Sequence, residues 1–338
     1  MKPIIITVQP DDEYFKWQNH LYIESCLESG FDQEQIHILL YKPKGRPYNT
    51  NWDKLKEYYP NINIFLYEDK GVGQHLSTYI PILRPHTLWQ HFEAFPELQN
   101  KTIIYTDCDI LWIKGLDIEK LYSDEINYIS DAKSYLNYSY FESKNKQILE
   151  HKQNDLLSRD FLKEICDIVG IDKQLCIDND NNTGGVQYIL KNITSDFWKK
   201  VEKDVLSIRK HLLEVNKEFF ESENKGIQSW CADLWAVQFN LWFHNKEVRV
   251  VSELNFAWST DPITRLQTYK ILHNAGITSP VMNKVPSFFK GLYHNGGNPF
   301  NKGEHLYQVL ESEESQKLCT GYYANKLNEL NNKYKLTN

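Results

Sequence analysis

The stretch "TIIYTDCDILW", residues 102–112, decides both the fold class and the position of the candidate site. Its first part, residues 102–105, is a mostly apolar run with β-branched residues, which is typical of a buried strand. Asp107 and Asp109 then flank a cysteine, and the apolar run resumes at Ile110. Because burying unpaired carboxylates costs free energy, we expect the strand to end here and the two acids to lie at the edge of a sheet.

Short apolar segments alternate with longer amphipathic segments through the first half of the chain. This rhythm predicts an α/β fold with a single Rossmann-like domain, a mostly parallel central sheet and helices on both faces. Ligands of such sheets bind outside the carboxyl ends of the strands, where Asp107 falls. The expected strands are residues 3–8, 36–41, 62–67 and 102–107, and the expected helices are residues 12–29, 49–59 and 75–95, the last broken near Pro81 and Pro85.

The second half of the chain is less regular. We expect a glycine turn that runs into a strand at residues 182–191, and a charged helical tail from residue 304. The other expected strands are residues 125–130 and 247–252, and the other expected helices are residues 144–170, 195–215 and 226–244.

Composition excludes several classes of protein. The chain has 338 residues and a net charge of -7, and its Lys and Arg residues form no continuous stripe, so we expect no nucleic-acid partner. The N-terminal apolar run is too short for a signal peptide, and no segment approaches the roughly 18 apolar residues of a membrane span, so we expect a cytoplasmic protein. Six scattered cysteines without a C-x-x-C pair favour neither a zinc knuckle nor a disulfide framework.

The spacing of the two aspartates predicts a metal site. Carboxylates at positions i and i+2 of a strand point to the same face. A hard divalent cation, Mn²⁺ or Mg²⁺, would relieve their repulsion and could hold a diphosphate. The alternative is a pair of surface aspartates in a β-turn.

The segment "IIYTDCDILWIKGLD", residues 103–117, resembles the D-x-D segment of nucleotide-sugar glycosyltransferases with the type A fold. The resemblance implies a metal-dependent enzyme that moves a sugar from a nucleoside-diphosphate sugar to an acceptor hydroxyl. It also implies a UDP-sugar as the donor, with Asp107 and Asp109 on the metal and Asp107 near the donor. Three further features of the family have counterparts here in the same order along the chain.

The first is a glycine-rich segment near the donor and acceptor, matched by "NNTGGVQYILK" with Gly184, Gly185 and Gln187. The second is an acid at a helix start that faces the acceptor, matched by Asp233 in "SWCADLWAVQF". Its apolar neighbours would raise its pKa toward that of a useful base. The match is partial, since Ala232 stands where the family often has Glu, and a capping or ion-paired aspartate is the alternative.

The third feature is a histidine that completes the metal shell. His273 in "YKILHNAGI" and His294 in "FFKGLYHNGGNPF" are both candidates. The second segment loosely resembles the H-x-x-G-x-x-K-P-W ending of glycogenin-like transferases, which favours retention of configuration. Asn298 replaces the lysine of that ending, so we expect Lys290 to contact the diphosphate instead.

Three other segments fit a donor pocket, each with a structural role as the alternative. The first expected strand is followed by the part of the chain where the type A fold holds the nucleotide base. The candidates there are Thr7, near the end of the strand, and Gln9 and Tyr14, which come after it. Arg84 in "PILRPHTLWQHF" would pair with an acid such as Asp107 or contact the sugar or phosphate. Asp131 would reach a sugar hydroxyl.

The resemblance also predicts the organisation of the chain. Residues 1–300 would form the catalytic domain, with a nucleotide-binding half over about 1–125 and an acceptor half over about 126–300, and residues 301–338 a C-terminal helical extension. Asp233 would act as the base of an inverting reaction, or only orient groups in a retaining one. The rival functions are a nucleotidyl or phosphoryl transferase of similar topology and a non-catalytic carbohydrate- or protein-binding module on the same scaffold.

Overall fold

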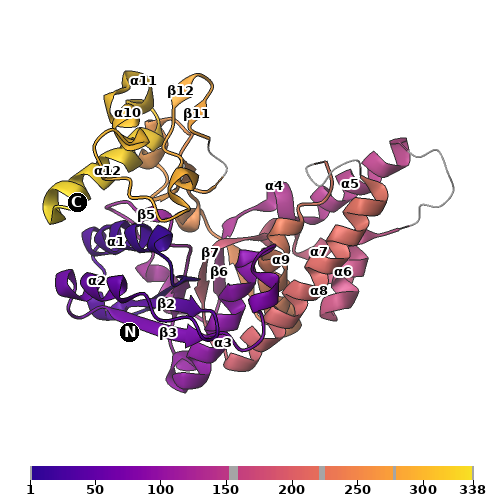
Figure 1. Ribbon diagram of the computed structural model, residues 1–338. Coiled ribbons are helices and arrows are strands. Elements are labelled where there is room, and N and C mark those ends of the chain that lie inside the picture. Colours follow the sequence, from indigo (N-terminus) through magenta and orange to yellow (C-terminus); the bar gives the residue numbers. More distant parts are fainter. Residues whose placement is uncertain (1, 152–158, 221–224, 277–278, 337–338) are drawn as a thin grey trace. The chain divides into compact units, whose positions relative to one another are not determined.

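The computed structural model describes residues 2–151, 159–220, 225–276 and 279–336 (Figure 1). The fold is α/β, with a seven-stranded, mostly parallel sheet in the order β3-β2-β1-β4-β7-β6-β8 and helices on both faces. Smaller sheets are formed by β5-β10-β9 and by β11-β12. The strands are β1 (Ile4–Pro10), β2 (Ile36–Lys42), β3 (Asn63–Glu68), β4 (Ile103–Tyr105), β5 (Ile110–Trp112), β6 (Asn127–Asp131), β7 (Gly184–Leu190), β8 (Val248–Val250), β9 (Ala257–Trp258), β10 (Ile271–His273), β11 (Val281–Met282) and β12 (Val285–Pro286).

The helices alternate with the strands in the first half of the chain and dominate much of the second half. They are α1 (Glu13–Glu28), α2 (Asp53–Tyr58), α3 (Leu83–Ala94), α4 (Lys133–Leu136), α5 (Tyr138–His151), α6 (Phe161–Val169), α7 (Lys173–Asp178), α8 (Ser195–Phe219), α9 (Ala232–Phe243), α10 (His305–Glu311), α11 (Glu313–Gln316) and α12 (Cys319–Tyr334).

The predicted α/β class, the mostly parallel sheet and the C-terminal helices are confirmed. The predicted helix 144–170 corresponds to parts of α5 and α6, and its residues 152–158 lie outside the described residues. Three other helix predictions were too long. The segment 49–59 becomes α-helical only at Asp53, after a 3₁₀ turn at Thr50–Trp52. The segment 75–95 becomes a helix only from Leu83, after a short 3₁₀ turn that contains Pro81, because proline lacks the N–H that helix propagation needs. The segment 226–244 likewise becomes α-helical only at Ala232, after a 3₁₀ turn at Ser229–Cys231.

The chain forms two compact units of discontinuous sequence. Unit 1 comprises Asp69–Ile104 and Leu121–Val251, and unit 2 comprises Lys2–Glu68, Tyr105–Lys120 and Ser252–Asn338. The predicted division near residues 125 and 300 stays a prediction.

Unit 2 contains the parallel pairs β1·β2 and β2·β3 and a core in which α1, β5, β10 and the C-terminal helices meet. In Figure 1, α10, α11 and α12 gather beside β11 and β12. Trp17 of α1 packs its ring edge-on against Phe288 and Tyr293, with centroid distances of 6.0 and 6.2 Å. This core supports the segments that carry the candidate metal ligands.

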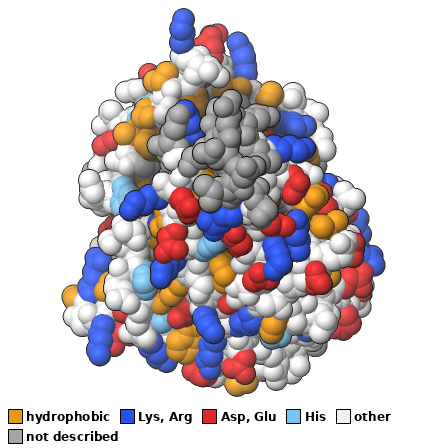
Figure 2. Space-filling model, turned by 90° about the vertical axis from the view of Figure 1, so that its right-hand side faces the viewer, with side chains coloured by type: hydrophobic (Ala, Val, Ile, Leu, Met, Phe, Trp, Pro, Cys, Tyr) orange, Lys and Arg blue, Asp and Glu red, His pale blue; other side chains and the backbone are white. Residues whose placement is uncertain are grey.

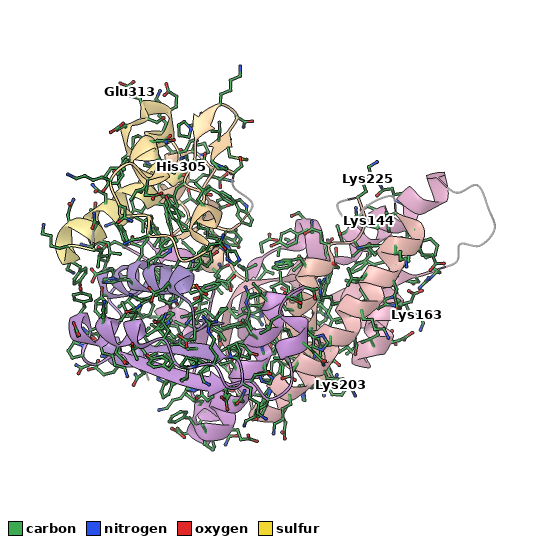
Figure 3. All side chains as sticks on the ribbon, in the orientation of Figure 1. Lys144, Lys163, Lys203, Lys225, His305 and Glu313 are labelled. Atoms are coloured by element: carbon green, nitrogen blue, oxygen red, sulfur yellow. The ribbon has the colours of Figure 1, made fainter. Side chains whose placement is uncertain are left out.

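Unit 1 is built on β6, which pairs antiparallel with β7 and parallel with β8. Helices α3, α6 and α9 contact the 25-residue helix α8, whose apolar side is buried. Figure 3 labels Lys144 on α5, Lys163 on α6 and Lys203 on α8. Lys163 pairs with Asp167 on the same helix at 2.6 Å, so charges of opposite sign are neighbours there.

Basic and acidic side chains are interspersed on the face of the molecule drawn in Figure 2. None of the helices within the described ranges combines the length and the hydropathy needed to cross a membrane.

Candidate metal and sugar-transfer site

The two aspartates lie in the turn between β4 and β5, as the sequence predicts. The backbone N–H of Thr106 donates to the carbonyl of Ile6 at 3.2 Å, and the Thr106 hydroxyl lies 2.7 Å from that of Tyr22. These bonds fix the start of the turn. Asp107 is partly exposed, whereas Asp109 is only 8% exposed. The chain therefore buries a carboxylate at the point where the strand has ended.

His273 reaches the aspartates through a short strand pairing. Strand β10 runs antiparallel to β5, which places His273 opposite Ile110, and parallel to β9, which places it opposite Trp258. The rings of His273 and Trp258 stack with a centroid distance of 5.6 Å and an interplanar angle of 18°. The imidazole is 4% exposed, so its orientation is set by packing.

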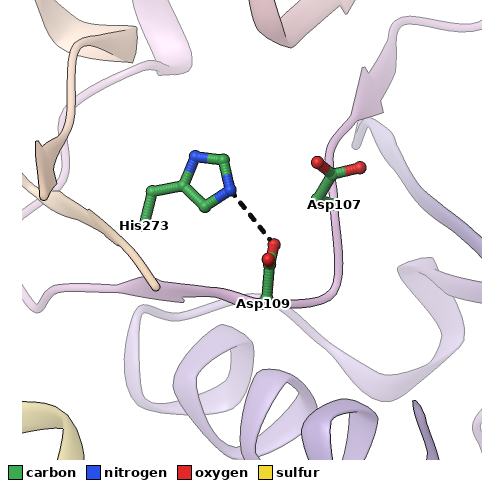
Figure 4. Close-up of side chains that lie close together, drawn as sticks. All are labelled: Asp107, Asp109 and His273. Atoms are coloured by element: carbon green, nitrogen blue, oxygen red, sulfur yellow. Dashed lines mark ion pairs between the residues drawn. The ribbon is translucent and has the colours of Figure 1, made fainter. Parts of the chain in front are cut away.

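Asp107, Asp109 and His273 form a group whose ligand atoms all lie within 4.8 Å of one another (Figure 4). His273 Nε2 lies 3.2 Å from Asp109 Oδ1. Two carboxylates and one imidazole are a donor set that suits Mn²⁺ or Mg²⁺ better than a soft thiophilic metal. His273 Nδ1 is buried without a hydrogen-bond partner.

Lys290, in the 3₁₀ turn Lys290–Tyr293, donates a hydrogen bond to Asp109 Oδ2. Both side chains are 11% exposed. Burial acts to raise the pKa of the Asp109 carboxyl, but its interactions with Lys290 and His273 outweigh burial and hold the pKa well below its usual range. Burial acts to lower the pKa of Lys290, yet its attraction to Asp109 leaves that pKa raised. Both groups are therefore ionised at neutral pH.

His294 does not belong to the metal group found among the described residues. Its ring stacks on that of Tyr14 with a centroid distance of 5.2 Å and an angle of 19°. Tyr14 is buried at the start of α1, which raises the pKa of its hydroxyl to about 12. Of the two candidate histidines, His273 is the one that the fold brings to the aspartates.

Thr7 and Gln9 are buried in β1. Thr7 Oγ1 lies 3.2 Å from Gln9 Oε1, and Gln9 Nε2 donates to the carbonyl of Leu39 in β2 at 3.2 Å. The Gln9–Leu39 bond joins β1 to β2 and the Thr7 hydroxyl contacts the same Gln9 amide, so both side chains have a structural role besides the predicted nucleotide contact.

Within unit 1, Asp233 and Arg84 form an ion pair. Arg84 Nη1 lies 2.7 Å from Asp233 Oδ2, and Tyr79 Oη donates to Asp233 Oδ1 at 3.2 Å and accepts from the Asp233 N–H at 3.0 Å. The sequence suggested apolar surroundings for Asp233. The fold instead gives it polar partners from the segment before α3 and from α3 itself.

Two polar side chains hold the glycine segment, Gly184 and Gly185, and no sequence motif points to either of them. The Ser130 hydroxyl donates to the Gly185 carbonyl, and the Gly184 N–H donates to Gln238 Oε1 of α9 at 3.2 Å. A Cβ on Gly184 would lie 1.9 Å from the Ser130 carbonyl oxygen, so only glycine fits there. Val186 has a φ of 77°, which is unusual and strained for a β-branched residue.

Gln187 follows this strained residue and is completely buried, with no hydrogen-bond partner for its side-chain amide oxygen or nitrogen. A buried unpaired amide is costly and calls for an explanation, such as a bound partner.

Asp131, at the end of β6, is exposed. Its carboxylate accepts a hydrogen bond from the Lys133 backbone N–H at 2.9 Å and pairs with the Lys133 ammonium group at 3.4 Å. Asp131 thus ends β6 and bonds to the first residue of the short helix α4.

No family model and no curated protein matches the chain. Among solved structures, it is similar to the bifunctional glycosyltransferase WbbM, with 9% identity and a TM-score of 0.44 over 97% of this chain and 52% of the longer one. It is also similar to the galactosyltransferase LgtC in complex with donor and acceptor sugar analogues, with 11% identity and a TM-score of 0.42 over 97% of this chain and 95% of that one. A third is mouse xyloside xylosyltransferase 1, with 10% identity and a TM-score of 0.36 over 83% of this chain and 100% of that one.

Proposed function

We propose that this chain is a metal-dependent glycosyltransferase that moves a sugar from a nucleoside-diphosphate sugar to an acceptor hydroxyl. The observation that carries the proposal is the group of Asp107, Asp109 and His273, gathered where β4 ends. Carboxyl ends of strands are the ligand-binding edge of an α/β sheet. The D-x-D resemblance makes a UDP-sugar the proposed donor.

The residues of this group fit a divalent cation. Asp109 Oδ1 is buried with His273 Nε2 at 3.2 Å, and its carboxylate is ionised, as a metal ligand must be. Asp107, Asp109 and His273 would hold Mn²⁺ or Mg²⁺. When bound, such an ion supplies positive charge that stabilises the departing diphosphate.

Lys290 is proposed to add a second positive charge for the diphosphate. Its ammonium group lies at the same carboxylate, is buried and stays charged. A cation held in place before the reaction stabilises developing negative charge without reorganisation. The Tyr14 hydroxyl stays protonated at neutral pH and can donate a hydrogen bond.

Unit 1 is proposed to serve the sugar and the acceptor. Gly184 and Gly185 allow close approach of the backbone to a ligand, and the unpaired amide of Gln187 offers both a donor and an acceptor. Asp233, paired with Arg84, is suited to orienting an acceptor hydroxyl. This role agrees with the retaining reaction that the glycogenin-like ending favours.

The test is nucleotide-sugar hydrolysis with and without Mn²⁺, together with a thermal-shift panel of UDP-, GDP- and CMP-sugars. Asp109→Asn is expected to abolish Mn²⁺-dependent hydrolysis of a UDP-sugar. Ligand at a hundredfold excess over Kd should stabilise the parent by about 2.7 kcal/mol. Asp117→Asn, which changes an exposed aspartate of the same unit, is the matched control and should keep full activity. Equal turnover by Asp109→Asn and the parent would refute the proposal.

A further inference from the structure

Trp230 is 56% exposed and is the one tryptophan in the exposed class among the described residues. It lies in the 3₁₀ turn Ser229–Cys231, one helical turn before Asp233. A single exposed aromatic residue needs no function by itself. What distinguishes Trp230 is the set of polar groups that surround it.

The backbone of Trp230 is fixed by a buried neighbour. Tyr79, which is 1% exposed, donates its hydroxyl to the Trp230 carbonyl at 2.9 Å and contacts Asp233 through the same oxygen. The rings of Tyr79 and Trp230 meet edge to face at a centroid distance of 5.4 Å. Arg209 lies over the Tyr79 ring at 4.4 Å and donates to the Thr78 carbonyl at 2.7 Å. The indole is therefore held in place while much of its surface stays free.

Charged groups stand beside this aromatic surface. Residues three apart on a helical turn share a face, so Trp230 and Asp233 are neighbours. Asp233 is paired with Arg84 at 2.7 Å, and Arg84 remains 25% exposed. A carboxylate and a guanidinium together accept and donate hydrogen bonds.

We propose that Trp230 is the platform on which the sugar ring of the acceptor stacks, and that the acceptor of the proposed transferase is a carbohydrate. A pyranose ring presents an apolar C–H face, which fits an indole, and an edge of hydroxyls, which fit the Asp233–Arg84 pair. This inference rests on the proposed function and adds the class of acceptor to it.

A protein partner would need a wider apolar patch than this turn offers. The large exposed apolar side chain of the following helix α9 is Phe243, at its far end. At a rise of about 1.5 Å per residue, the helix separates it from Trp230 by roughly 15 Å or more.

Saturation-transfer NMR on the full chain tests the inference, with methyl glycosides of glucose, galactose, mannose and N-acetylglucosamine as probes. At least one glycoside should receive saturation on its ring C–H protons. Trp230→Ala should weaken its affinity at least tenfold, Trp230→Phe should weaken it less, and Phe243→Ala should leave it unchanged.

Binding of no glycoside to the parent, or equal binding by Trp230→Ala, would overturn the inference. A shift from dimer to monomer in Trp230→Ala by sedimentation would overturn it too, since the indole would then be a contact between copies. If the parent hydrolyses a UDP-sugar through Asp109 but binds no glycoside, the acceptor inference fails and the proposed function stands. If glycosides bind through Trp230 but hydrolysis survives Asp109→Asn, the proposed function fails instead.

Discussion

Replacing Lys290 with methionine removes the charge that neutralises Asp109 while keeping the length of the side chain. Both partners are 11% exposed, so the pair is buried. Removing one partner of a buried ion pair typically costs about 3–5 kcal/mol, because the other charge is left uncompensated. For 338 residues the entropy of unfolding is about 0.7 kcal/mol per degree, so we expect Tm to fall by roughly 4–7 °C in metal-free buffer.

Manganese should reverse much of this loss. In the parent, an ion that binds Asp109 competes with Lys290 for the same carboxylate. In Lys290→Met that competition is gone, and the ion gives Asp109 the positive charge it lacks. We expect the Mn²⁺-induced rise in Tm to be larger in the variant than in the parent, although the variant hydrolyses the nucleotide sugar more slowly.

The assay is thermal unfolding in chelator and in saturating Mn²⁺ at one pH between 5 and 9. The pKa of Asp109 is lower in the folded chain than its unfolded value of 3.8, so ionised Asp109 stabilises the fold above pH 3.8. This stabilisation is lost as the pH falls through the folded pKa. The raised pKa of Lys290 contributes stability below its unfolded value of 10.5, which is lost as the pH rises through the folded value. The contribution of the pair is therefore constant across this window.

Lys163→Met is the matched control, since its pair with Asp167 is 58% and 60% exposed. Such exposed pairs contribute little to stability, so the Tm of Lys163→Met should stay within about one degree of the parent's. Equal Tm values for Lys290→Met and the parent without metal, or equal Mn²⁺ shifts, would refute the assigned role of Lys290.

Three further predictions concern the fold. Burial lowers the pKa of His20 from 6.5 to about 4, so the free energy of unfolding falls as the pH drops from 6.5 toward 4. In His20→Phe this pH-dependent loss, up to about 3 kcal/mol, should disappear from unfolding titrations between pH 7 and 4. Gly184→Ala should cost about 1–3 kcal/mol by urea unfolding, because its Cβ meets the Ser130 carbonyl, whereas Gly276→Ala, with open space around it, should change little. Val186→Gly should stabilise the protein by about 1 kcal/mol, because glycine adopts the positive φ of this position without strain. An unchanged or lower stability would contradict backbone strain at Val186.

The local features of this fold could be predicted because each depends on neighbouring residues. Alternating apolar and amphipathic segments identified the strands and helices of the first half, and the break in apolar character at Asp107 marked the end of β4. The double glycine at the start of β7 was likewise a local signal of a special backbone.

Partners far apart in the sequence could not be predicted in the same way. Lys290 and Asp109 are 181 residues apart, and Arg84 and Asp233 are 149 apart. The sequence named all four as site candidates, but it assigned Lys290 to a diphosphate and offered Arg84 an acid such as Asp107, or the sugar or phosphate, and not Asp233. The polar surroundings of Asp233 arise from Tyr79 and Arg84, which no pattern within "SWCADLWAVQF" reveals.

The choice between His273 and His294 shows why a motif alone does not define such a site. Side chains alternate between the two faces of a strand, so a slip of one residue would turn His273 away from Asp109. The three-residue strand β10 avoids this because β5 and β9 both pair with it and fix its register from two sides. Strands this short carry too few residues for a periodic signal, so the pairing that completes the metal group emerges only in the folded chain.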